Sequence, residues 1–455
     1  MEKENGKSFV KNKRIKPGQL VLLLLFIAVI ALPGILVFHD TGRYLPGDNR
    51  MAAPLPRLVG PEGRFVTREE IESFVDDNIG FRTAAPQLDS RIMYSMFGAI
   101  LDDAQLRGKD GNLFAGDDRR FPARRAPYPP LTEDELAENG RNIEAAADYF
   151  KTKDIPFLFI TIPNKEEVYP DLYPDTFLER PGTSRLAQQV EWLNANTGVD
   201  AYDMTQALRE KARAQREKAG APDGNAGAPD GKAGAPDEKA TAPDGKAGAP
   251  DGMLWYETKD NAHWNYMGAW YGYLEIMGRL KAYDPGLKTL ELEDFDVSVS
   301  TEPYINWDGS YAFKGLQNTV YTFDYKPGFS CEQISNDDDP WMPQDQLDIA
   351  GFQKGGVYFH FHNEGQSGVL VFFGDSYIYQ FLLPYFSESF GDVYLFHLPT
   401  NYRIMRPVLD MIGADYVVLE MVERTYGTTN IELMAEEFLA GVPVLTRPEG
   451  YPAAG

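Results

Sequence analysis

The sequence contains only one cysteine in 455 residues, Cys331, which excludes a disulfide within the chain. A chain of this length can be stabilised by a hydrophobic core without such cross-links. No group of cysteine and histidine residues has the spacing of a zinc site, and no cofactor motif is present. We therefore expect neither a resident metal nor a cofactor.

Positive charge is also scarce, with 44 Lys and Arg residues against 68 Asp and Glu residues and a formal net charge of -24. A protein this acidic repels phosphate backbones, so nucleic acid is excluded as a partner. Hydrophobic residues make up 43% of the chain, which suffices for a large core. The 25 Tyr, 27 Phe and 6 Trp residues suit stacking on carbohydrate, but we favour their more frequent use in filling the core.

The N-terminus is typical of a membrane anchor. Residues 1–19 are basic, and an uninterrupted apolar run of 19 residues follows at 20–38. At ~1.5 Å per residue, a helix over this run spans roughly the ~30 Å hydrocarbon core of a bilayer. The basic flank predicts a cytoplasmic N-terminus and an extracytoplasmic remainder, in a single-pass protein of the cell membrane. The alternative is a cleaved signal peptide, but no small-x-small cleavage site follows Phe38, and we favour the anchor.

Between the anchor and residue 130 we expect a helical stalk or cap, followed by a linker. A helix-start pattern begins at Thr67, and a turn follows at 108–114. Residues 122–130 are rich in proline, which is typical of a linker. We expect residues 131–455 to form the main domain.

Strands alternate with helices through this domain. Apolar segments predict buried strands at 156–162, 198–202, 369–373, 393–396 and 416–420. Helices are expected at 131–151, 204–217, 377–390, 402–412 and 430–439. Such alternation predicts an α/β sandwich with a central parallel sheet that is covered on both faces.

An insertion interrupts the domain at 218–252. It contains five seven-residue repeats of the type Lys-Ala-Gly-Ala-Pro-Asp-Gly. The segment lacks bulky apolar side chains that would offset the entropy of ordering it, and glycine does not recur at every third position as in collagen. We expect a disordered spacer rather than a site.

The first motif with chemical character is Gly374-Asp-Ser, at the end of a predicted strand. Gly374 permits a tight turn, after which Asp375 and Ser376 stand at the carboxyl edge of the sheet, where ligands bind in open α/β folds. The amino end of the next helix also presents N–H groups to a developing oxyanion. By itself, however, Gly-Asp-Ser is a common turn-and-cap sequence.

The second motif, at 258–265, contains Asp260 and His263. Asn265 is a suitable N-cap for a helix at 266–281, so His263 is predicted to lie in a loop from which its imidazole can reach a serine. Asp260 can hold the other ring nitrogen. A lone histidine is usually structural, but an acidic neighbour and a strand-end serine favour a base that activates Ser376 as nucleophile.

The remaining histidines are weaker candidates. His39 lies at the membrane boundary, and His397 ends an apolar strand in the core or at the edge of the site. His360 and His362 alternate on one face of a strand, where a polar strand face is favoured over a metal pair.

Together these motifs resemble the SGNH hydrolase superfamily. The His loop precedes the Ser motif here, and this permuted order is similar to that of the alginate O-acetyltransferases (AlgX/AlgJ-like) and their DHHW-type relatives. Segments 77–82, 108–114, 162–170 and 422–426 resemble further parts of that branch. The resemblance implies an SGNH-like three-layer sandwich. Many members carry the acid two residues before the His, where this chain has Asn261, so we expect Asp260 to take that role.

The resemblance also implies a function. Ser376 would accept an acetyl group with His263 as base and pass it to a hydroxyl of an exported cell-surface polysaccharide, and a multipass membrane acyltransferase would supply the acyl group. Two alternatives stay open, namely an acetylesterase of surface glycans and a non-catalytic scaffold or glycan-binding subunit of a polysaccharide export complex. For substrate binding we single out Lys165, for which a solvated loop lysine is the alternative, and Arg403. For the oxyanion we single out the Ser376 N–H, Asn306 and Gly309.

Overall fold

The computed structural model describes residues 16–36, 44–45, 50–59, 64–80, 88–89, 92–93, 96, 105–109, 112–115, 130–173, 183–218, 254–256, 263–305, 312–334, 358–379, 382–397, 402, 405–428 and 431–440. Two compact units make up the chain, Met1–Leu101 with Tyr304–Lys314, and Asp102–Pro303 with Gly315–Gly455. The predicted repeat insertion lies outside the described residues beyond Lys218, and so does the predicted linker before Pro130.

The first unit contains the apolar N-terminal helix α1 (Pro17–Leu36). In the described part of the chain, α1 is the one helix long and apolar enough to cross a membrane, and none of its apolar stretch is buried within the protein. A membrane anchor and a signal sequence both have this character. The unit also contains a short antiparallel pair, β1 (Tyr44–Leu45) and β2 (Arg50–Met51).

Helix α2 (Arg68–Asn78) begins where the sequence predicts. The Thr67 hydroxyl accepts the N–H of Glu70 at 3.2 Å, and the Glu70 carboxylate accepts the N–H of Thr67 at 2.8 Å. This reciprocal cap satisfies two N–H groups that have no partner within the helix. At the other end, the buried Asp77 carboxylate accepts the N–H of Ala53 at 2.9 Å and so ties the preceding segment to the helix.

The second unit is built on a seven-stranded sheet with the order β6-β5-β13-β11-β12-β10-β9. Its first five strands are parallel, whereas at one edge β10 pairs in antiparallel fashion with both β12 and β9. The predicted α/β class with a central, mostly parallel sheet is confirmed. The strands are β5 (Phe157–Ile162), β6 (Asp200–Asp203), β9 (Glu332–Ile334), β10 (Tyr358–His362), β11 (Val369–Gly374), β12 (Asp392–His397) and β13 (Tyr416–Val422).

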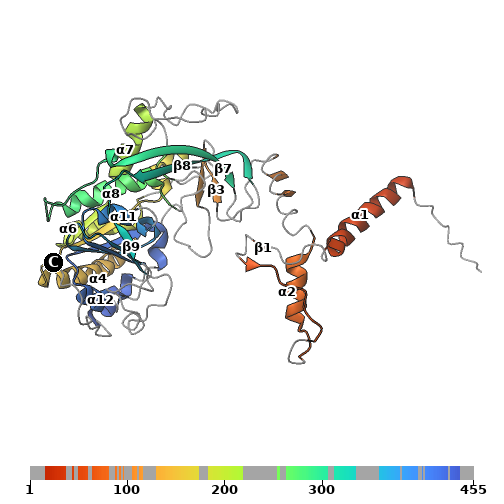
Figure 1. The fold of residues 1–455 in the computed structure, drawn as a ribbon, viewed down its shortest axis with the longest axis horizontal. Coiled ribbons are helices and arrows are strands. Elements are labelled where there is room, and N and C mark those ends of the chain that lie inside the picture. Colours follow the sequence, from red (N-terminus) through yellow and green to blue (C-terminus); the bar gives the residue numbers. More distant parts are fainter. Residues whose placement is uncertain are drawn as a thin grey trace, which may run out of the picture. The chain divides into compact units, whose positions relative to one another are not determined.

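Side chains alternate between the two faces of this sheet and build a core on each. On β11, Leu370 and Phe372 join one core, while Val371 and Phe373 join the other. Helix α8 covers the first face, and α4 and α12 cover the second, which gives three layers (Figure 1). The first core includes α7 (Thr205–Lys218), α8 (Tyr266–Leu280) and α11 (Leu383–Ser387); the second includes α4 (Glu133–Thr152), α6 (Arg185–Asn196), α12 (Met405–Ile412) and α13 (Met434–Ala440).

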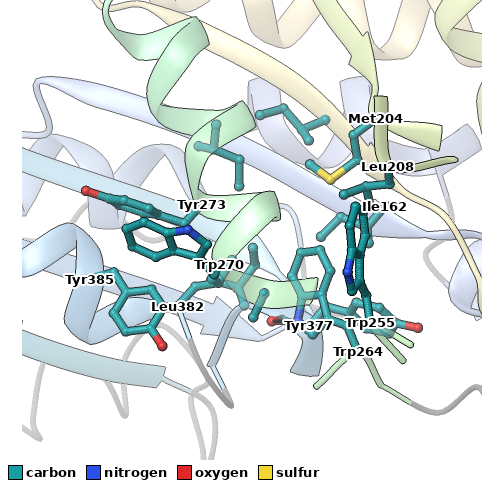
Figure 2. Packing of buried hydrophobic residues seen from close by; sticks show 14 of the residues in the cluster. Ile162, Met204, Leu208, Trp255, Trp264, Trp270, Tyr273, Tyr377, Leu382 and Tyr385 are labelled. Carbon is teal, nitrogen blue, oxygen red and sulfur yellow. Dashed lines mark hydrogen bonds between the residues drawn. The ribbon is translucent and has the colours of Figure 1, made fainter. Parts of the chain in front are cut away.

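Aromatic rings fill much of the core under α8 (Figure 2). The ring centroids of Trp264 and Tyr377 lie 5.2 Å apart, and those of Trp270 and Tyr273 lie 5.4 Å apart. Burying one such side chain stabilises a fold by ~1.5–3 kcal/mol, and paired rings add to this. This packing fixes the segments before α8 and after β11, which carry the candidate nucleophile and base.

The remaining elements are hairpins and short helices. As the predicted turn requires, β3 (Gln105–Arg107) and β4 (Leu113–Ala115) form an antiparallel pair. A longer pair consists of β7 (Phe295–Ile305) and β8 (Ala312–Tyr325). The short helices are α5 (Lys165–Val168), η5 (Pro170–Leu172), η6 (Leu292–Asp294), η8 (Glu423–Thr428) and η9 (Ile431–Leu433).

One predicted helix differs from the structure. The segment 377–390 is not a single helix but contains α10 (Ser376–Tyr379) and α11 (Leu383–Ser387). Pro384 lies in the first turn of α11, where its missing N–H is tolerated, whereas inside a continuous helix it would remove a backbone hydrogen bond. The short first helix leaves Ser376 at the end of its strand rather than at the start of a long helix.

Candidate active site

Ser376 follows β11 by one residue and opens α10. All six residues of β11 are buried, so the strand holds the position of the turn that follows it. A Cβ atom on Gly374 would lie only 2.7 Å from Oε2 of Glu420 on the neighbouring β13. Gly374 is therefore required for this close approach, and its φ is not positive, so the turn after β11 does not depend on a left-handed backbone conformation.

His263 is held by the two residues that follow it. The indole N–H of Trp264 donates to the carbonyl of Tyr377 at 3.1 Å. The side chain of Asn265 caps α8 by accepting the N–H of Gly268 at 3.0 Å, which confirms the predicted N-cap. These contacts attach the His263 loop to α8 on one side and to the residue after Ser376 on the other.

The structure brings His263 and Ser376 together. Nε2 of His263 lies 2.6 Å from Oγ of Ser376, within the distance of a hydrogen bond. In this geometry a neutral imidazole can accept the hydroxyl proton as Oγ attacks an electrophile, which is the arrangement of an activated serine nucleophile. Asp260 and Asn261 lie outside the described residues, so the acid that would orient His263 stays a prediction.

A third group at the site, Arg424, was not predicted from the sequence. It lies in η8, directly after β13, and is 5% exposed. Its Nη2 lies 3.2 Å from Oγ of Ser376 and 3.5 Å from Nε2 of His263, and its guanidinium lies 4.5 Å from the centre of the Tyr377 ring. A fixed positive charge beside the nucleophile can stabilise negative charge that develops there.

Buried carboxyl groups support the turn that carries Ser376. Asp375 is 2% exposed; its Oδ1 accepts the N–H of Tyr377 at 2.9 Å and its Oδ2 accepts the hydroxyl of Thr425 at 3.3 Å. The N–H of Asp375 donates to Oε2 of Glu420 at 2.9 Å. Asp375 therefore links the strand end of β11 to the loop that carries Arg424.

Glu420 is fully buried beneath this turn. Burial raises its pKa well above the ordinary value, the negative charge of Asp375 raises it further, and the Asp375 N–H and the Arg424 charge oppose the rise. Its Oε1 has no hydrogen-bond partner among the described residues. Burial therefore favours the protonated, uncharged form of this side chain.

We expect Glu420→Gln to become more stable relative to wild type as pH rises above the ordinary pKa of a glutamate. Folded wild type retains a proton that the unfolded chain releases above the ordinary pKa of 4.5, so its stability falls as pH rises toward the folded pKa. The glutamine amide resembles the protonated acid and has no proton to release in this range. The free energy of unfolding of the variant, relative to wild type, should therefore grow by up to about 1.4 kcal/mol for each pH unit in this window. Thermal unfolding of both proteins from about pH 5 to about pH 8 measures this. The prediction would be contradicted if the difference in Tm between the two proteins were the same at the lowest and at the highest pH.

Of the other predicted site side chains, Lys165 lies among the described residues. Lys165 is fully buried at the start of α5, where its Nζ donates to the carbonyl of Leu113 at 3.0 Å and lies 5.0 Å from the centre of the Phe114 ring. The alternative of a solvated loop lysine is therefore wrong, and a contact of Lys165 with substrate stays a prediction. Arg403, Asn306 and Gly309 lie outside the described residues, as does His39.

Comparison with known proteins gives only distant likenesses. No family model and no curated protein sequence matches the chain. Among solved structures, Bacillus cereus PatB1 with a sulfonyl adduct is 12% identical, with 72% of this chain and 98% of that chain covered and a TM-score of 0.46. A DHHW family protein from Eubacterium siraeum is 11% identical, with 74% and 96% covered and a TM-score of 0.44. The O-acetyltransferase domain of Pseudomonas putida AlgJ is 15% identical, with 73% and 99% covered and a TM-score of 0.41.

Proposed function

We propose that this chain is a serine-dependent O-acetyltransferase that moves acetyl groups onto hydroxyls of an exported cell-surface polysaccharide. The observation that carries the proposal is the 2.6 Å contact between His263 Nε2 and Ser376 Oγ, with the Arg424 guanidinium beside both. The motif resemblance described above favours the acetyl group and the polysaccharide acceptor. Helix α1 supports an extracytoplasmic enzyme anchored in the cell membrane.

The proposed reaction has two steps. In the first, Ser376 Oγ attacks the carbonyl carbon of an acetyl donor while His263 Nε2 takes the hydroxyl proton. The carbonyl oxygen becomes an oxyanion on the carbon that is now bonded to Oγ, within reach of the Arg424 guanidinium. Its collapse expels the donor's leaving group, which takes the proton from His263. In the second step a sugar hydroxyl loses its proton to His263 and attacks the acetyl-Ser376 carbonyl. Collapse of the second tetrahedral intermediate breaks the bond between the acyl carbon and Oγ, and Oγ takes the proton back from His263. The products are the acetylated sugar and free Ser376.

An acetylesterase is the second candidate, because the same contact between Ser376 and His263 also serves water as the acceptor. The two functions differ only in what enters during the second step, and this depends on the exclusion of water. A non-catalytic scaffold is less consistent with a serine and a histidine held at hydrogen-bond distance. The donor proposed from the resemblance is a multipass membrane acyltransferase acting beside α1.

The test is to trap the acyl group and then offer it an acceptor. The full-length chain, purified in detergent, is incubated with a chromogenic acetyl ester and digested, and its peptides are examined by mass spectrometry. We expect one acetyl group on the peptide that contains Ser376, and faster loss of that group with acetylation of the sugar when oligosaccharides are added. Ser330→Ala, which removes an exposed serine before β9, should not change the adduct.

The outcomes separate the candidates. Loss of the acetyl group at the same rate with and without oligosaccharide, over a panel of neutral and anionic glycans, would favour the esterase. Absence of any adduct at Ser376, from several acetyl donors, would oppose both enzymatic functions.

A further inference from the structure

Three side chains that commonly bind metals converge at the antiparallel edge of the sheet, apart from the Ser376 site. His360 and His362 lie two residues apart on β10, and Asp392 is the first residue of β12. In the register of these strands, His362 lies opposite Asp392 and His360 lies opposite Tyr394. The three side chains therefore share one face of the sheet. The sequence alone favoured a polar strand face here because the carboxylate lies about thirty positions further along the chain.

The geometry of this group is already close to that of a metal site. Nε2 of His360 and Nδ1 of His362 each lie 2.8 Å from Oδ1 of Asp392. The atoms that the three residues offer all lie within 4.8 Å of one another. The His360 ring is fully buried and stacks on Tyr394, with 4.1 Å between the ring centroids, so its orientation is fixed. His362 and Asp392 keep side-chain exposures of 23% and 20%, which leaves a path from solvent.

The charge on Asp392 suits a cation. An aspartate carboxylate is ordinarily ionised at neutral pH, so Asp392 brings a negative charge to this group. The net charge of -24 on the chain also favours the approach of a cation.

We propose that His360, His362 and Asp392 bind a divalent metal ion of the zinc class. Two imidazole nitrogens and a carboxylate oxygen are typical zinc ligands, with bond lengths of ~2.0–2.2 Å. Tetrahedral bonds of that length place ligand atoms roughly 3.4 Å apart. Each nitrogen–oxygen distance therefore has to lengthen by about half an ångström, and the two ring nitrogens, which lie within 4.8 Å of each other, have to reach the same separation. Without metal, each ring donates the N–H that faces the Asp392 carboxylate. A metal ion takes the place of these protons, so each neutral imidazole then binds through the nitrogen that faces Asp392 and carries its proton on the other nitrogen.

A fourth ligand can come from the neighbouring strand or from water. Glu332 on β9 lies opposite His362 in the antiparallel register, and its side chain is exposed on the same face. With Glu332 the metal would connect β9, β10 and β12. With water instead, it would connect only β10 and β12.

The metal would be structural rather than catalytic. Asp392 pairs with Val369 at the beginning of β11, whereas Ser376 follows Gly374 at the other end of that strand. The five residue steps along β11 from Val369 to Gly374 correspond to about 17 Å, at ~3.3 Å per residue. A metal there stabilises the antiparallel edge of the sheet and does not touch the reacting atoms.

Metal binding is tested on the full-length chain in detergent, without an oligohistidine tag and after dialysis against a chelator. Zinc is titrated in competition with a chromophoric chelator, and cobalt is followed by its visible absorption. We expect one equivalent of tightly bound zinc and a tetrahedral cobalt spectrum. Asp392→Asn and His362→Gln should each raise the Kd for zinc at least about 10-fold. Glu364→Gln, which removes an exposed carboxylate from the turn after β10, should leave the Kd unchanged.

Unfolding measurements give a second readout that does not depend on catalysis. Zinc should raise the Tm of wild type and of Glu364→Gln but not that of Asp392→Asn, because a ligand stabilises only the state that binds it. If Asp392→Asn does not fold, His362→Gln decides, since its side chain is partly exposed. Wild type that binds less than one equivalent, or variants that bind zinc as wild type does, would overturn the proposal and leave a hydrogen-bonded network of the three side chains.

Discussion

Replacing Ser376 with alanine is expected to lower kcat/KM for a chromogenic acetyl ester by about 10⁴-fold or more. The substitution removes the hydroxyl oxygen that lies 2.6 Å from His263 Nε2 and that would carry the acyl group. Ser376 opens a short helix, and alanine is favoured in helices, so the fold should be retained. The measurement is the initial rate of ester cleavage by the full-length protein in detergent, with Tm as the control for folding.

His263→Ala should have a similar effect, and the double variant should be no slower than either single variant. A nucleophile and its base act as a unit, so the second substitution has nothing left to remove. Ser330→Ala provides the matched control and should cleave at the wild-type rate. If the two single losses multiplied in the double variant, or if Ser376→Ala kept more than about a tenth of the wild-type rate, Ser376 would not be the nucleophile.

The sheet could be predicted from the sequence because its central strands are short, apolar and buried on both faces. Each of β5, β11 and β13 contains a continuous run of large apolar residues, and the segments between them have helix-forming patterns. The pairing of β7 with β8 was not foreseen. These strands contain polar residues such as Thr301 and Asn318, so no apolar run distinguishes them from loops.

The site could be predicted only in part, because the sequence gives little indication of which distant residues lie close together in the fold. Ser376 and His263 stood out since a strand end and a capped helix start carry them, and both features are local. Arg424 has no such signature. Its role depends on the adjacency of β11 and β13, which places the residues after both strands at one edge of the sheet. An arginine soon after a strand that ends beside the Ser376 strand is the signal that could have found it.

Helix breaks and buried carboxyl groups limit such predictions for a different reason. The apolar pattern after Ser376 is compatible with one long helix, and only the position of Pro384 shows where it has to restart. Glu420 lies in a run of buried apolar residues, and the apolar pattern gives no reason for a carboxyl group there. The reason is its contact with Asp375, which only the structure shows. A polar residue in an otherwise apolar strand beside a candidate nucleophile is therefore worth testing.

Arg424→Gln is expected to lower kcat for ester cleavage by about 10²- to 10³-fold, with a small effect on KM. Glutamine retains a donor but loses the charge that lies 3.2 Å from Ser376 Oγ, so an oxyanion formed there loses more stabilisation than the neutral substrate does. The kcat of Arg424→Lys should fall between those of wild type and Arg424→Gln. An ammonium keeps the charge but not the planar guanidinium that contacts both Ser376 and the Tyr377 ring. Arg213→Gln removes an exposed arginine of α7 and is the matched control.

The division of the effect between kcat and KM distinguishes catalysis from packing. Arg424 is almost fully buried against Tyr377, so its removal will also lower Tm, and a fall in Tm alone carries no information about the reaction. If the guanidinium stabilises the oxyanion, formation of acetyl-Ser376 is slowed in a single turnover at temperatures far below Tm, and lysine restores part of the rate. If it serves only to position the loop after β13, lysine and glutamine will differ in Tm but not in the rate of acylation. Arg424 would then be a structural residue, and the oxyanion would depend on backbone N–H groups such as that of Ser376.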